Sequence, residues 1–214
     1  MSANYKPIRK DRVQFLNLDE PNFDYKSELY PANDTPILIS SKGKIEWKLA
    51  RFGLIPFKAE DFNEVKNIYN VDAEIVVKEV NLQHAWNKNQ FALIPVEVIF
   101  EPKYIDDKAH SYGIYRQDNM PFTIAAIYEY ATIGDKEILS MSILTINADT
   151  HPLMKQFRAS EDEKRSFVVI PEGHRLDWLN CDHEQALEFI IEFSPDEFTA
   201  APKSEMHKYR PDLY

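Results

Sequence analysis

Cysteine and glycine are scarce in this sequence, whereas proline is not. The 214 residues include a single cysteine, Cys181, so the chain cannot form an internal disulfide. This is consistent with a reducing compartment, and we expect a cytoplasmic protein. Five glycines against thirteen prolines indicate stiff, extended connections and few turns that require a positive φ.

Long apolar runs are also missing. No stretch approaches the roughly 18 consecutive apolar residues that a membrane-spanning helix needs. The first twelve residues are polar and basic and do not resemble a signal peptide. We therefore expect a soluble protein without a membrane partner.

Basic charge is in deficit, with 25 lysines and arginines against 35 acidic residues and a net charge of -10. Nucleic-acid-binding proteins usually present a basic face to the phosphates, so this balance argues mildly against DNA as a partner. Two local basic stretches, residues 6–12 and 203–210, are either phosphate-binding segments or solvated chain ends.

Motifs for nucleotide cofactors and metals are absent from the sequence. It contains no GxGxxG, GxxxxGK or GxSxG segment, and its six histidines and one cysteine show no zinc-ligand spacing. We expect neither a cofactor nor a metal.

Short apolar segments predict most of the secondary structure. Strands are expected at residues 36–40, 45–52, 75–77, 91–100, 122–128, 139–146 and 166–170. Residues 60–69 fit either a short helix or a loop, and Pro95 predicts a break or an edge within its strand. Residues 180–193 are the clearest helix, with Asp182 as N-cap and Gln185 three positions later.

Many strands and few helices indicate an α+β fold, a single domain on a curved, mixed, mostly antiparallel sheet with flanking helices. We expect the domain to cover residues 1–193. Residues 194–214 are proline-punctuated and polar, and we expect a tail that is extended over the surface or frayed.

Six segments carry a resemblance to a known family. In order, they are RFGLIP (51–56), NVDAE (70–74), ALIPVEVIFE (92–101), AAIYE (125–129), LTINA (144–148) and RSFVVIP (165–171). They resemble the RWGLIP, NARAE, CLIPADGFYE, AGLWE, LTxxA and RMPVIL segments of the SRAP family of abasic-site-processing proteins. The resemblance covers residues 30–179 and implies a barrel-like core.

The resemblance also implies a chemistry, one linked to the DNA damage and SOS responses. An N-terminal cysteine, exposed by methionine removal, condenses through its α-amine with the aldehyde of an abasic site in single-stranded DNA. Its thiol then closes a thiazolidine. Some members free this terminus by self-cleavage, as a peptidase would.

The family's reactive residues are only partly present. Asn70 and Glu101 match the asparagine and the glutamate, whereas Ser2 stands in place of the cysteine. Asp72 stands in place of the arginine, and Arg158 in place of the histidine. We hypothesise that Asp72 and Arg158 form an ion pair across the former pocket; the alternative is two independent, solvated charges.

Two functions follow from this pattern. The first is abasic-site processing through the amine of Ser2, with Asn70 and Glu101 assisting. In this case the lyase chemistry is retained and the durable crosslink is weakened or lost. The second is a catalytically silent paralogue that binds DNA or a protein partner without covalent chemistry.

Overall fold

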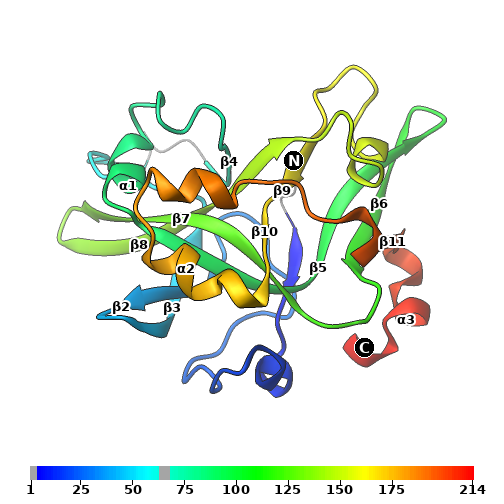
Figure 1. The fold of residues 1–214 in the computed structure, drawn as a ribbon, viewed down its shortest axis with the longest axis horizontal. Helices are drawn as coiled ribbons and strands as arrows, with labels where there is room; N and C mark the ends of the chain where they lie inside the picture. The colour runs from blue at the N-terminus through cyan, green and yellow to red at the C-terminus, as the bar shows by residue number, and fades with distance from the viewer. Residues whose placement is uncertain (1–3, 63–67) are drawn as a thin grey trace.

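Strands dominate the computed structural model, which describes residues 4–62 and 68–214 (Figure 1). The strands are β1 (Tyr5–Pro7), β2 (Asp34–Ser41), β3 (Lys44–Phe52), β4 (Asn70–Asp72), β5 (Phe91–Ile105), β6 (Lys108–Arg116), β7 (Phe122–Ile133), β8 (Lys136–Asn147), β9 (Arg165–Phe167), β10 (Val169–Ile170) and β11 (Phe198–Pro202). The α-helices are α1 (Gln83–Asn87), α2 (Arg175–Asn180) and α3 (Met206–Tyr209). The 3-10 turns are η1 (Lys10–Leu16), η3 (Met154–Gln156), η4 (Glu172–His174), η5 (Gln185–Phe189), η6 (Pro195–Glu197), η7 (Lys203–Glu205) and η8 (Pro211–Leu213).

Five of the strands close into a barrel. The ladder runs from β5 through β2, β3, β8 and β7 and returns to β5. Four of these five pairings are antiparallel, and β3 with β8 is parallel. Two of the seams are short, because β2 with β5 and β3 with β8 each pair over two residues. The expected mixed, mostly antiparallel, barrel-like sheet is confirmed.

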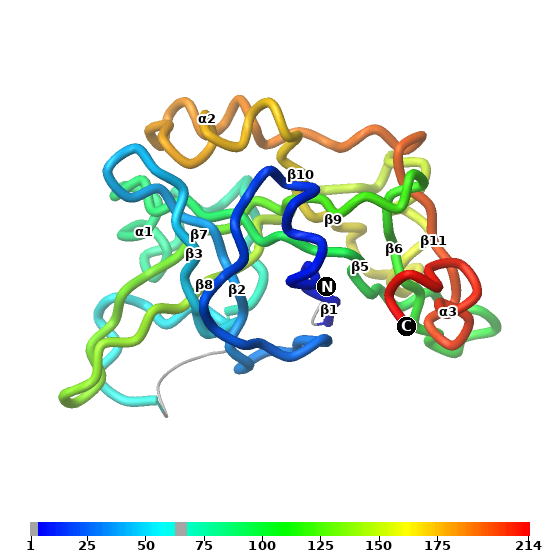
Figure 2. Tube along the Cα trace, turned by 90° about the horizontal axis from the view of Figure 1, so that it is seen from below, coloured from blue at the N-terminus to red at the C-terminus, as the bar shows by residue number. Residues whose placement is uncertain are grey.

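Alternating side chains place most of the buried core in two large clusters, as the period of a strand requires, and two smaller clusters lie beside them. The first, which we call the Tyr5 cluster, includes Tyr5, Phe52, Ile99, Ile143 and Phe157. The second, the Trp86 cluster, lies under α1 and α2 and includes Val71, Trp86, Phe91, Leu144 and Trp178. Figure 2 shows α2 running along one side of the sheet.

Strand β5 holds the molecule together because it changes partners along its length. Residues 91–96 pair with β7, and residues 99–105 pair with β6. Pro95 lies just before this change and pairs with Thr123 of β7, so of the two expected alternatives, a break or an edge, the break is wrong. The Pro95 carbonyl accepts a hydrogen bond from the N–H of Ile8 at 2.9 Å.

Two expected elements are wrong. Residues 75–77 form turns, because the N–H of Val76 bonds back to the carbonyl of Asp72. The helix expected at 180–193 is only the 3-10 turn η5, which ends as Ile190 leaves helical geometry at φ -85° and ψ 78°. Part of the 60–69 segment lies outside the described residues.

The segment from residue 194 is integrated into the fold. Strand β11 pairs along β6, from Phe198 opposite Arg116 to Pro202 opposite Tyr112. Arg210 is completely buried, and its Nη2 lies 3.0 Å from Oε2 of the equally buried Glu97. The boundary expected at residue 193 therefore does not separate a loose tail from the domain.

No helix within residues 4–62 and 68–214 combines the length and apolar character needed to cross a membrane.

Candidate functional site

The N-terminal segment is anchored on β5. Strand β1 pairs with β5, with Tyr5 opposite Ile99. The N–H of Phe100 then donates to the carbonyl of Asn4 at 2.9 Å, and the Asn4 amide donates to Glu28 at 2.8 Å. The chain is therefore fixed from residue 4, directly beside the residue that precedes Glu101. Ser2 lies outside the described residues.

Glu101 is a buried carboxylic acid on this stretch of β5, with 3% of its surface exposed. It pairs with Tyr112 of β6 and lies two residues after Ile99, a member of the Tyr5 cluster. Because strand side chains alternate, Glu101 faces the side of the Tyr5 cluster.

Asn70 faces the same side. It begins β4, which runs parallel to β8 with Asn70 beside Ile143. The next residue, Val71, belongs to the Trp86 cluster, so Asn70 points to the opposite face. Three aromatic rings connect the N-terminal strand β1 with the segment before Asn70. The Phe52 ring lies 5.3 Å from Tyr5 and 6.2 Å from Tyr69, centroid to centroid.

Arg158 reaches the site through its backbone. Its N–H donates to the carbonyl of Pro102 at 2.7 Å, so it lies beside the residue that follows Glu101. Its φ of 69° is in the left-handed region, which non-glycine residues seldom adopt. The guanidinium donates to the Glu163 carbonyl and lies 4.0 Å from the Asp162 carboxylate.

The expected ion pair between Asp72 and Arg158 is wrong. Asp72 pairs instead with Arg165, at 3.0 Å. Strands β4 and β9 both pair with β8 at Thr145, which brings these two side chains together. Thr145 takes part directly, because its hydroxyl donates to Asp72 at 3.1 Å and its carbonyl accepts from Arg165 at 2.9 Å.

Arg165 is the centre of a larger charge cluster, to which the sequence analysis gave no role. Its side chain is 4% exposed and also lies 2.6 Å from Glu74 and 3.1 Å from Glu163. Burial acts to raise the pKa of Glu74, but hydrogen bonds from Arg165 and the Asn147 N–H outweigh it and hold the pKa below its usual value. Glu74 and Arg165 each lie in one of the six motifs, and this position was the feature of the sequence that could have identified them as site residues.

A second group next to Asn4 was also missed. Glu28 accepts hydrogen bonds from Lys203 at 2.5 Å and from the Tyr30 hydroxyl at 2.6 Å. Burial acts to lower the pKa of Lys203, and its bond to Glu28 raises the pKa above the ordinary value. A cavity of about 660 Å³, lined in part by Glu28, Lys203 and Tyr112, opens here. The basic stretch at 203–210 was the only indication of it in the sequence.

The backbones of Asn4 and Arg158 are thus hydrogen-bonded to β5 on either side of Glu101. Asn70 of β4 faces the Tyr5 cluster, as Glu101 does. Such a group can bind a polar ligand and exchange a proton at a buried carboxylate. Among residues 4–62 and 68–214, no three His, Cys, Asp or Glu side chains are grouped to hold a metal ion.

The model of one protein family, SOS response associated peptidase (SRAP), matches residues 3–207. The chain belongs to this family.

Solved structures share the fold. A protein from Bordetella bronchiseptica is 26% identical, with a TM-score of 0.88 over 94% of this chain and 98% of its own. A protein from Bacteroides thetaiotaomicron is 18% identical, with a TM-score of 0.80 over 99% and 97%. A phage-related protein from B. bronchiseptica is 14% identical, with a TM-score of 0.67 over 94% and 92%. A search of curated proteins gave no match.

Proposed function

We propose that this chain senses abasic sites in single-stranded DNA through the α-amine of Ser2, with Asn70 and Glu101 beside the reacting atoms. The observation that supports this most is the anchoring of Asn4 against Phe100, next to Glu101. Two extended residues span about 7 Å, so an amine at residue 2 is within reach of that carboxyl group.

An amine suffices for the first step. A terminal amine has an ordinary pKa of about 7.7 to 8.0, so part of it is neutral and nucleophilic near pH 7. The nitrogen adds to the aldehyde carbon of the opened sugar, water leaves, and an imine forms. Ser2 offers a hydroxyl in place of a thiol, so the ring that would make the adduct durable closes poorly and reopens easily.

The two neighbouring side chains have separate tasks in this proposal. The Glu101 carboxyl group accepts and returns the proton that moves as water leaves. Its 3% exposure keeps bulk water away from that transfer. The Asn70 amide donates a hydrogen bond to a sugar oxygen, which orients the aldehyde toward the amine.

A second candidate function is a silent paralogue that binds DNA or a protein partner without covalent chemistry. The observation that favours it is the surplus of acid around Arg165, where Asp72, Glu74 and Glu163 share one guanidinium. This local excess of negative charge is part of the net charge of -10 and opposes a phosphate, so it favours a protein partner over DNA.

Borohydride trapping tests the proposal. The protein, with removal of Met1 verified by intact mass, is incubated with an oligonucleotide that carries one abasic site, with and without reductant. We expect an adduct only in the reduced sample, and a stable adduct without reductant from Ser2→Cys. Glu101→Gln is expected to slow trapping at least about tenfold, since general acid–base catalysis contributes 10²–10⁴-fold.

The matched control is Glu137→Gln, an exposed glutamate on β8 that leaves trapping unchanged. If neither the parent chain nor Ser2→Cys is trapped while both remain folded, the amine proposal fails. Retention of undamaged DNA that falls with rising salt then supports the silent paralogue acting on DNA.

A further inference from the structure

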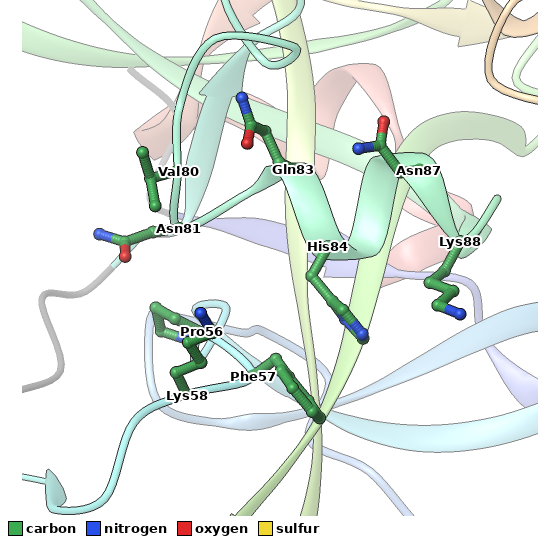
Figure 3. Close-up of a pocket in the computed structure, with 9 residues that line it drawn as sticks. All are labelled: Pro56, Phe57, Lys58, Val80, Asn81, Gln83, His84, Asn87 and Lys88. Carbon is green, nitrogen blue, oxygen red and sulfur yellow. The ribbon is translucent and has the colours of Figure 1, made fainter.

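A second cavity lies away from the site described above. It measures about 330 Å³ and lies between α1 and the loop that follows β3 (Figure 3). None of Asn70, Asp72, Glu101 and Arg158 lines it. Its size lies at the lower end of cavities that hold small ligands.

A stacked ring pair forms one wall. The rings of Phe57 and His84 lie 4.1 Å apart, centroid to centroid, with an angle of 9° between their planes. In Figure 3 the His84 ring comes from α1 and lies beside the Phe57 ring, which comes from the loop. Phe57 remains 49% exposed, which leaves ring surface free for another planar group.

A buried acid fixes the imidazole. Glu129 of β7 is 1% exposed, and its Oε2 lies 2.7 Å from Nδ1 of His84. The carboxylate accepts the hydrogen bond from the Nδ1–H, and its other oxygen accepts one from the N–H of Tyr130 at 3.0 Å. A ring held in this way is a prepared wall rather than a mobile surface side chain.

The charges of the lining are one-sided. Lys58 and Lys88 belong to it, together with three side-chain amides, and none of its described residues is acidic. This is unexpected in a chain with ten more acidic than basic residues. Glu129, which contacts the lining residue His84, is engaged by its imidazole.

We propose that this cavity binds one nucleotide unit, with the base against Phe57 and the phosphate between the lysines. The base offers the π-face that stacks on an aromatic ring, and the amides offer donors and acceptors for its edge. The source is either a free nucleotide or one residue of a nucleic-acid strand. This inference goes beyond the amine chemistry proposed above and stands independently of it.

Calorimetric titration with AMP, adenosine and inorganic phosphate tests the two halves of the ligand. We expect AMP to bind more tightly than either fragment. Phe57→Leu should weaken AMP at least about fivefold, from the value of one base–aromatic stack. Lys88→Ala should weaken AMP and leave adenosine unchanged. Phe62→Leu is the matched control, with the same 49% exposure but outside the lining.

An undamaged oligodeoxyadenylate separates the sources. Binding of AMP alone identifies a free nucleotide. Oligonucleotide binding that Phe57→Leu weakens and Phe62→Leu does not identifies a strand. If AMP does not bind and the two leucine variants bind the oligonucleotide equally, the nucleotide site is refuted. Because these ligands carry no aldehyde, their result is separate from the trapping of abasic DNA.

Discussion

The buried pair of Arg210 and Glu97 leads to a quantitative prediction about the C-terminal segment. Both side chains are fully buried and lie 3.0 Å apart. Arg12 approaches the other Glu97 oxygen at 2.9 Å, so one carboxylate serves two guanidiniums. Removing one partner of a buried ion pair costs about 3–5 kcal/mol, because the other charge is left uncompensated in a low-dielectric site.

The two possible deletions should differ. Arg210→Met leaves Glu97 paired with Arg12, so we expect the lower end, about 3 kcal/mol. Glu97→Leu leaves Arg210 and Arg12 to share the partly exposed Asp212, at 2.8 and 3.4 Å, so we expect the upper end, about 5 kcal/mol.

Urea unfolding followed by tryptophan fluorescence measures both changes. With a slope of about 1–3 kcal/mol/M, a loss of about 3 kcal/mol moves the midpoint by at least about 1 M. Lys208→Met is the control, because Lys208 is 60% exposed on the same segment and should change stability by less than about 0.5 kcal/mol. A loss below about 1 kcal/mol for Arg210→Met, typical of exposed pairs, would refute the reasoning.

Three further predictions concern the core and the charge cluster. Gly113→Ala should cost about 1–3 kcal/mol in thermal unfolding, because the new Cβ would lie 2.7 Å from Val98 Cγ1. The Cys181 thiol should react with a maleimide far more slowly in the folded than in the urea-unfolded chain at pH 8, because burial raises its pKa to about 11; equal rates would contradict this. The pKa of Glu74 is depressed in the fold, so its contribution to stability is present near neutrality and lost as the pH falls through that pKa. Urea titrations below about pH 5 should therefore show a shallower pH dependence in Arg165→Gln than in the parent chain.

Strand positions could be predicted from the sequence where apolar residues recur with a period of two or run continuously. Residues 36–40, 45–52, 91–100, 122–128 and 139–146 all lie within strands β2, β3, β5, β7 and β8. Strand β6 was missed because its first half, residues 108–111, is polar and exposed. These residues are held in a strand by pairing with β5, which the composition of the segment does not indicate.

The helix expected at 180–193 shows how a correct local signal can mislead. Asp182 and Gln185 do form the reciprocal cap: the N–H of Gln185 donates to Asp182, and the N–H of Asp182 donates to the Gln185 amide. The apolar stripe behind it is only partly used, since Leu187 is 53% and Ile191 is 62% exposed. Without a surface to bury both, the backbone leaves the helix after Phe189.

The candidate site could be predicted in its members but not in its pairings. Asn70 and Glu101 emerged from motif positions, and both face the Tyr5 cluster. The partner of Asp72 depends on β4 and β9 meeting at Thr145 of β8, and these are pairings between distant parts of the chain. The sequence alone indicated only Arg158 as a partner of Asp72, whereas the sheet register places Arg165 beside it.

The parallel seam of the barrel has a consequence for how the molecule folds. Arg51 and Phe52 meet Ser140 and Met141, so the strands that complete the barrel come from opposite halves of the chain. Bringing these two strands together closes a long loop, which costs conformational entropy before the contacts between the strands can form. Domains dominated by such distant pairings fold in milliseconds to seconds, and closure of this seam is therefore expected to be among the last events.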